Sequence, residues 1–103
     1  MAAALAARAA GVEDVLLLER DQHLGGILNQ CIHPGFGLHH FKAELTGPEY
    51  ADRFARLVKA DPGLEVSMRS FAVRLTKDKE LSYLRPGALE EIKAGSVILA
   101  TGC

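Results

Sequence analysis

A run of four apolar residues, Val15–Leu18, stands between charged residues near the start of the chain. Such a run, without polar alternation, is typical of a short strand that helices cover on both faces of a parallel sheet. A second run of this kind occupies residues 97–100, near the other end. The pattern therefore predicts two buried parallel strands, one at residues 15–19 and one at residues 97–100.

The first eleven residues are rich in alanine, which has the highest intrinsic helix propensity. Gly11 ends this stretch and can adopt the left-handed conformation of a helix C-terminus without steric cost. We therefore expect a helix over residues 1–11. Its small side chains would let it lie very close to a strand.

A second helix is predicted after Thr46. Thr46 and Glu49 have the spacing of a capping box, and Pro48 falls in the first turn, where a missing N–H is tolerated. Apolar residues then recur at helical spacing, namely Tyr50, Ala51, Phe54, Leu57 and Val58. The helix is expected to end at the turn of residues 61–63, with its charged face in solvent.

The last third of the chain has short strand-like segments separated by turns. Residues 64–68 predict a further parallel strand. The segments that follow it, at residues 71–75, 81–84 and 89–93, predict a small antiparallel meander with turns at residues 77–79 and 85–87. The chain as a whole is therefore expected to have an α/β fold.

Composition limits the function classes. The chain has 103 residues, 49% of them hydrophobic, and a net charge of -1, which is typical of one ordinary domain or part of one. It has no basic cluster for nucleic acid and no apolar run long enough to span a membrane. We therefore expect no nucleic-acid partner, no membrane span and a cytoplasmic location. Cys31 and Cys103 fit neither a secreted disulfide framework nor a zinc site.

Glu19 stands at the end of the first predicted strand. In a dinucleotide-binding unit, an acidic residue at the end of the second strand accepts hydrogen bonds from the ribose of the cofactor, roughly 20 residues past a glycine-rich turn. Glu19 has this position if a strand and a Gly-x-Gly-x-x-Gly loop precede residues 1–11. We therefore expect Glu19 to bind a ribose.

The stretch AAALAARAAGVEDVLLLERDQHLGG resembles the start of the FAD-binding domain in flavoproteins of the glutathione reductase, or pyridine nucleotide-disulfide oxidoreductase, type. The closing VILATG, at residues 97–102, is similar to the second fingerprint of flavoproteins with two dinucleotide domains. The resemblance covers nearly the whole chain. It implies a partial Rossmann-like FAD-binding domain at residues 1–103, with parallel strands, two to three helices and a small antiparallel meander. The first strand and the glycine loop of that domain would be lacking.

One segment departs from the family pattern. Disulfide reductases of this type carry a Cys-x-x-x-x-Cys pair, but the corresponding positions here are Leu28 and His33, and Cys31 falls between them. No dithiol can therefore cycle at the flavin. The segment GGILNQCIHPGFGL instead resembles a bacterial FAD-dependent oxidoreductase subfamily without the redox disulfide.

Cys31 admits several roles on the sequence alone. It could ligate a metal with His33, His39 and His40, although metal sites usually have two separated ligand pairs, and we expect none here. A thiol beside an imidazole could also be an activated nucleophile. Otherwise Cys31 is a small buried apolar group, or it acts with Gln30 and His33 as a hydrogen-bonding or proton-handling group near the flavin.

The resemblance also implies which residues bind the cofactor. They are Glu19, Arg20, Gly25, Gly26, Gln30, Cys31, Val73, Thr101 and Gly102. The glycine pair would lead into a segment against the flavin, backbone groups near Val73 would meet the adenine ring, and Thr101 would lie beside the cofactor. FAD is the implied cofactor, with NAD(P) as a second one in the full-length protein. No catalytic residue is assigned.

The implied function is that of a fragment of an FAD-dependent oxidoreductase, with a nicotinamide nucleotide or a small organic substrate as its electron partner. The alternative is a noncatalytic product, either a truncated chain or a small α/β binding or structural module. The residues determine neither the substrate nor the oligomeric state.

Overall fold

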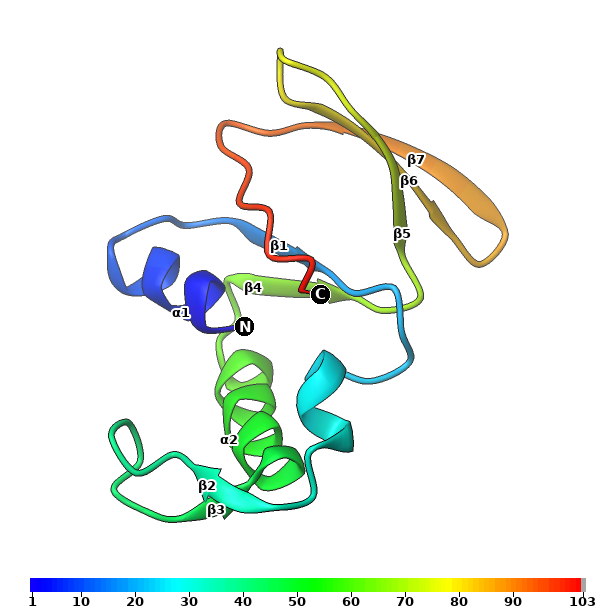
Figure 1. Cartoon of the computed structure of the whole chain (residues 1–103). Helices are drawn as coiled ribbons and strands as arrows, with labels where there is room; N and C mark the ends of the chain where they lie inside the picture. The colour runs from blue at the N-terminus through cyan, green and yellow to red at the C-terminus, as the bar shows by residue number, and fades with distance from the viewer. Residues whose placement is uncertain (103) are drawn as a thin grey trace.

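A computed structural model describes residues 1–102, and Cys103 lies outside the described residues (Figure 1). The elements are α1 (Ala2–Ala9), β1 (Val15–Leu18), the 3-10 helix η1 (Gly26–Gln30), β2 (Pro34–Phe36), β3 (Leu45–Thr46), α2 (Gly47–Ala60), β4 (Leu64–Ser67), β5 (Phe71–Leu75), β6 (Glu80–Arg85) and β7 (Ala88–Lys93). Residues 1–102 thus form a mixed α/β fold with two α-helices, a parallel strand pair, a short antiparallel pair and a three-stranded meander. In this part of the chain, neither helix is long and apolar enough to cross a membrane.

α1 ends at a glycine, as predicted. Gly11 has a φ of 96°, and its N–H donates to the carbonyl of Arg8 at 3.0 Å. The N–H of Val12 donates to the carbonyl of Ala7 at 3.1 Å. These two bonds form a Schellman motif, which satisfies carbonyl groups at the end of the helix. The chain can therefore turn directly from α1 toward β1.

The predicted strands at residues 15–19 and 64–68 pair with each other. β1 and β4 run parallel, in a register that joins Val15 to Leu64 and Leu18 to Ser67. The core comprises buried and half-buried side chains from both helices and one face of this pair, including Ala4, Leu5, Val15, Leu17, Val58, Leu64 and Val66. The prediction that β1 is covered on both faces is wrong. Its four residues are only half-buried, because α1 and α2 pack against the same face.

The capping box of α2 is confirmed. Thr46 Oγ1 accepts a hydrogen bond from the N–H of Glu49 at 3.4 Å, and Glu49 Oε2 accepts one from the N–H of Thr46 at 2.8 Å. Phe54 and Val58 are buried, as the helical pattern predicts, but Leu57 is 46% exposed. α1 covers only part of the apolar side of α2, which leaves Leu57 at the surface.

The segment after β1 packs against the first turn of α2. Gly25 and Gly26, with φ values of 119° and 52°, turn the chain into η1. The N–H of Gly47 donates to the carbonyl of Cys31 at 2.8 Å. A Cβ atom at residue 47 would overlap the carbonyl oxygen of Leu28. Only glycine therefore fits at this contact between η1 and α2.

The predicted meander is confirmed. β5, β6 and β7 pair in that order, each antiparallel to its neighbour. The register shifts between Ala72 and Arg74, so Val73 is the extra residue of a β-bulge. Tyr83 of β6 is buried, whereas all of β5 is exposed. The meander thus adds little to the core beneath α1 and α2.

The strand predicted at residues 97–100 is wrong. These residues have no strand pairing within residues 1–102, and Ile98 and Leu99 are 66% and 73% exposed. A strand needs a neighbour that satisfies its backbone hydrogen bonds. Among the described residues, β1 and β4 pair only with each other. An apolar run alone therefore does not produce a buried strand here.

We expect Gly47→Ala to destabilise the protein, because the added methyl group would displace η1 from α2. Such overpacking typically costs about 1–3 kcal/mol of unfolding free energy, which urea denaturation measures. Gly95→Ala is the matched control, since a Cβ atom at residue 95 meets no atom within 4 Å. Equal stability of the two variants would contradict the close contact at Gly47.

We expect acid to destabilise the wild-type protein more than Glu49→Gln. Hydrogen bonds from the backbone and side chain of Thr46 lower the pKa of Glu49 from its ordinary value of 4.5. This contribution to stability is complete above pH 4.5 and is lost as the pH falls through the lower pKa of the folded state. Thermal melts between about pH 6 and about pH 3 measure the difference. If the melting temperatures of the two proteins fell in parallel with pH, this contribution of Glu49 to stability would be excluded.

Candidate functional site

The carboxyl ends of β1 and β4 are joined by backbone hydrogen bonds. The N–H of Glu19 donates to the carbonyl of Ser67 at 3.0 Å, and the N–H of Ser70 donates to the carbonyl of Glu19 at 2.9 Å. The N–H of Arg69 donates to the carbonyl of Asp21 at 3.0 Å. We call residues 19–21 and 67–70 the carboxyl edge (Figure 1). The structure places Glu19, the predicted ribose acceptor, at its centre.

The side chain of Glu19 is a hydrogen-bond acceptor at this edge. Its Oε1 accepts from the N–H of Asp21 at 3.0 Å, and the residue is half-buried. Within the described chain, its second carboxylate oxygen receives no hydrogen bond. Arg20 differs, because its side chain is 71% exposed and lies 4.0 Å from Asp21. Glu19 is thus the better placed of the two predicted residues.

α1 begins near Glu19. Burial lowers the pKa of the Met1 amino group, and the negative charge of Glu19 acts in the opposite direction. Met1, the N-cap residue of α1, therefore has its amino group within electrostatic range of the carboxylate. No side chain of residues 1–102 caps this end of α1. Helix N-termini attract anions through free N–H groups and the helix dipole, so the carboxyl edge offers a hydroxyl acceptor and the start of α1 offers donors suited to phosphate.

Four other predicted cofactor residues lie around η1, at the first turn of α2. They are Gly25, Gly26, Gln30 and Cys31. A side chain at Gly25 would collide with Ala51 of α2, whereas the space at Gly26 is open. The structure therefore gives Gly25 a packing role inside the protein. Gln30 is exposed, and the carbonyl of Cys31 is bonded to α2.

The last three predicted residues are not joined to the carboxyl edge by any hydrogen bond of the described residues. Val73 lies in the bulge of the meander and is 48% exposed. Thr101 and Gly102 are exposed and follow the unpaired residues 97–100. Because the strand predicted before them is not formed, nothing within residues 1–102 fixes them next to Glu19.

Cys31 and the nearby histidines have separate partners. The thiol of Cys31 donates to the carbonyl of Ile27 at 3.4 Å. Nδ1 of His33 lies 3.0 Å from the carbonyl of Pro34 and therefore donates to it. His40 stacks on a phenylalanine of α2. In the described part of the chain, no three His, Cys, Asp or Glu side chains are placed to hold a metal ion.

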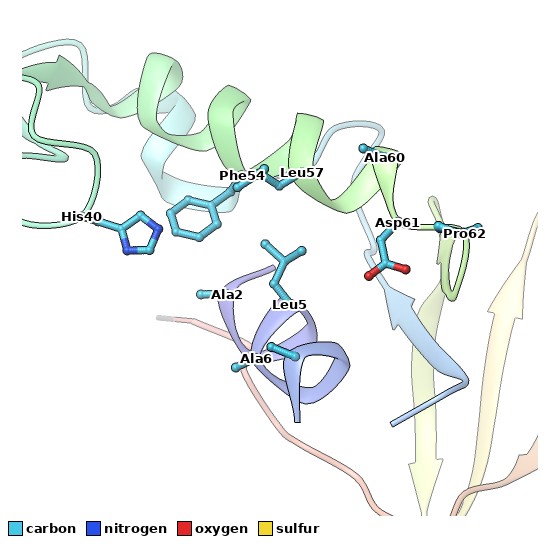
Figure 2. A pocket seen from close by; sticks show the side chains of 10 residues that line it. Ala2, Leu5, Ala6, His40, Phe54, Leu57, Ala60, Asp61 and Pro62 are labelled. Carbon is cyan, nitrogen blue, oxygen red and sulfur yellow. The ribbon is translucent and has the colours of Figure 1, made fainter. Parts of the chain in front are cut away.

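An apolar cleft that the sequence did not predict lies between α1 and α2 (Figure 2). Its volume is about 700 Å³, and it is lined mainly by Phe54, Leu57 and the alanine-rich side of α1. His40 and Asp61 also line it, but Asp61 is paired with Arg8 at 3.0 Å. The cleft therefore offers mainly apolar contacts. In the sequence, the signal that could have indicated this cleft was Leu57. It has the helical spacing of a buried residue, but the alanines of α1 are too small to cover it.

In the comparisons with known proteins, no family model, no curated protein and no solved structure matches this chain. The carboxyl edge is therefore interpreted from its own residues.

We expect Glu19→Gln to lower the pKa of the Met1 amino group further, because it removes the negative charge that favours the ammonium form. In the 103-residue chain, the NMR signal of an isotopically methylated amino terminus, followed against pH, measures this pKa. Glu65→Gln, at an exposed position of β4, is the control. The same pKa in all three proteins would show that Glu19 is not beside α1.

Proposed function

We propose that residues 1–102 are part of the FAD-binding domain of an FAD-dependent oxidoreductase of the glutathione reductase type, without the redox disulfide. The observation that carries the proposal is the position of Glu19 at the carboxyl edge, within electrostatic range of the amino group of Met1, the N-cap residue of α1. In dinucleotide-binding units, an acidic residue at such an edge bonds the ribose, and a helix N-terminus holds the phosphates. An acidic residue at the edge and a helix N-terminus within its electrostatic range are both present here, which supports the proposal.

The proposal includes a further parallel strand beside β1. The N–H groups of Val15 and Glu19 bond to β4 and the residue before it. Those of Leu16 and Leu18 face the other side, because successive N–H groups alternate along a strand. None of the described residues pairs with that side. We infer that a strand in a longer protein pairs there and leads through a glycine-rich loop into α1.

The residues of the carboxyl edge then have distinct roles. Glu19 accepts hydrogen bonds from the ribose hydroxyl groups, and the first N–H groups of α1 hold the diphosphate. When bound, FAD supplies hydride transfer, with NAD(P) or a small organic molecule as the electron partner. The contribution of this chain is to bind and orient the adenosine half of the cofactor.

We expect a chimera to bind FAD if a strand and a Gly-x-Gly-x-x-Gly loop from a known FAD-binding domain are joined in front of Ala2. The 103-residue chain alone should bind FAD only weakly, because its sequence contains no such loop for the diphosphate. In the chimera, Glu19→Ala should weaken FAD binding about 10- to 100-fold, since a hydrogen bond to a charged group contributes about 1.5–3 kcal/mol. Titration followed by flavin fluorescence measures the affinity.

Glu65→Ala is the matched control in the chimera, because Glu65 is an exposed acidic residue of β4 outside the carboxyl edge. If this control and Glu19→Ala bind FAD equally well, Glu19 does not belong to the site. A chimera that melts cooperatively and still binds no FAD would overturn the proposal. That result would favour the alternative of a noncatalytic α/β module.

A further inference from the structure

The turn of residues 67–70, at the end of β4, contains a hydrogen-bonded pair of hydroxyl groups, of which that of Ser70 is buried. Ser70 is 2% exposed and is the one buried polar residue among residues 1–102. Its Oγ lies 3.1 Å from the carbonyl of Met68 and 2.8 Å from Oγ of Ser67. A hydroxyl has one proton and a carbonyl only accepts, so Ser70 donates to Met68 and Ser67 donates to Ser70. Both hydroxyl protons are thus used within the turn.

Arg69, in the middle of this turn, has an unusual backbone conformation. Its φ of 52° lies in the left-handed region, which non-glycine residues rarely adopt. Its N–H donates to the carbonyl of Asp21 at 3.0 Å, and its Nη2 donates to Gln22 at 3.2 Å. A strained residue persists only where its surroundings hold it in place. Here the hydrogen-bonded pair of Ser67 and Ser70 flanks the strained residue on both sides.

We propose that Ser70 is a positioning residue for Glu19. The turn bonds both backbone groups of Glu19, through the carbonyl of Ser67 and the N–H of Ser70. The carboxylate of Glu19 is then fixed by the N–H of Asp21, whose carbonyl is itself bonded to the turn. Without the Ser70 hydroxyl, the turn loses its internal bonds, and the Glu19 carboxylate loses its fixed position.

The value of this position to a nucleotide rests on the proposed function, but the positioning can be tested without one. The amide of Asp21 donates to Glu19 Oε1, so its NMR signal depends on whether a charged carboxylate is held at this amide. An Asp21→Asn background removes the carboxylate of residue 21 itself. The amide of Thr46, which donates to Glu49 Oε2 at 2.8 Å, provides the same kind of signal at the start of α2.

We expect Ser70→Ala to abolish the pH-dependent shift of the residue 21 amide and to leave that of Thr46 unchanged. Ser67→Ala should reduce the shift in part, because the bond from Ser70 to Met68 remains. Ser82→Ala, which removes a hydrogen bond to Glu91 in the meander, is the matched control and should change neither signal.

Two outcomes would overturn the positioning role. A residue 21 signal that still titrates in Ser70→Ala would show that the hydroxyl does not hold Glu19. Loss of both the residue 21 and the Thr46 signals would show that Ser70 supports folding in general. A titration of the chimera with AMP separates this result from the proposed function, because the 103-residue chain contains no loop for the phosphate. AMP should shift the residue 21 amide of the chimera and shift it less when the chimera carries Ser70→Ala. If AMP shifts nothing while Ser70→Ala still abolishes the pH dependence, the positioning role stands and the ribose role of Glu19 fails.

Discussion

The parallel hydrogen-bonded ladder between β1 and β4 is the interaction on which the rest of the structure depends. It joins strands that lie far apart in the sequence, and it aligns their apolar side chains on one face. α1 precedes β1 and α2 precedes β4, and both helices pack on that face. The same ladder brings Glu19 beside the turn of residues 67–70. The core and the carboxyl edge therefore have one structural cause.

The elements that the sequence predicts best are those with local signals. Gly11 ends α1, and Thr46 with Glu49 begins α2, because each of these signals is satisfied by backbone groups within a few residues. The prediction fails where the outcome depends on distant partners. Residues 97–100 have the composition of a strand but pair with no other strand of the described residues. Leu57 has the helical spacing of a buried residue but is 46% exposed. The short pair of β2 and β3 has too few residues for any pattern.

The site shows the same division. The position of Glu19 at the end of a strand could be predicted, because the end of an apolar run is a local feature. The role of Ser70 could not, because the sequence does not indicate which backbone groups the turn will bond. The glycines are an intermediate case. The pattern marks Gly25 as special, but it suggests a ligand, whereas the space is occupied by Ala51. A glycine required for packing and one required for binding look identical in a sequence.

In the proposed FAD-binding domain, a single element would account for the two places where the prediction and the structure disagree most. Within residues 1–102, one side of β1 is unpaired, and residues 97–100 have a strand-like sequence without a pairing strand. Exposed strand edges and exposed apolar side chains such as Ile98 and Leu99 are features that proteins normally cover.

In the strand order of doubly wound sheets, the first strand lies between the second and the fourth. In the proposed FAD-binding domain, one strand inserted at that place would pair with β1 on one side and with residues 97–100 on the other. It would bring Thr101 and Gly102 to the same edge as Glu19, and its connection to α1 would supply the phosphate loop. An independent binding module would need a separate cover for each of these surfaces, so the FAD-binding domain is the simpler explanation of both.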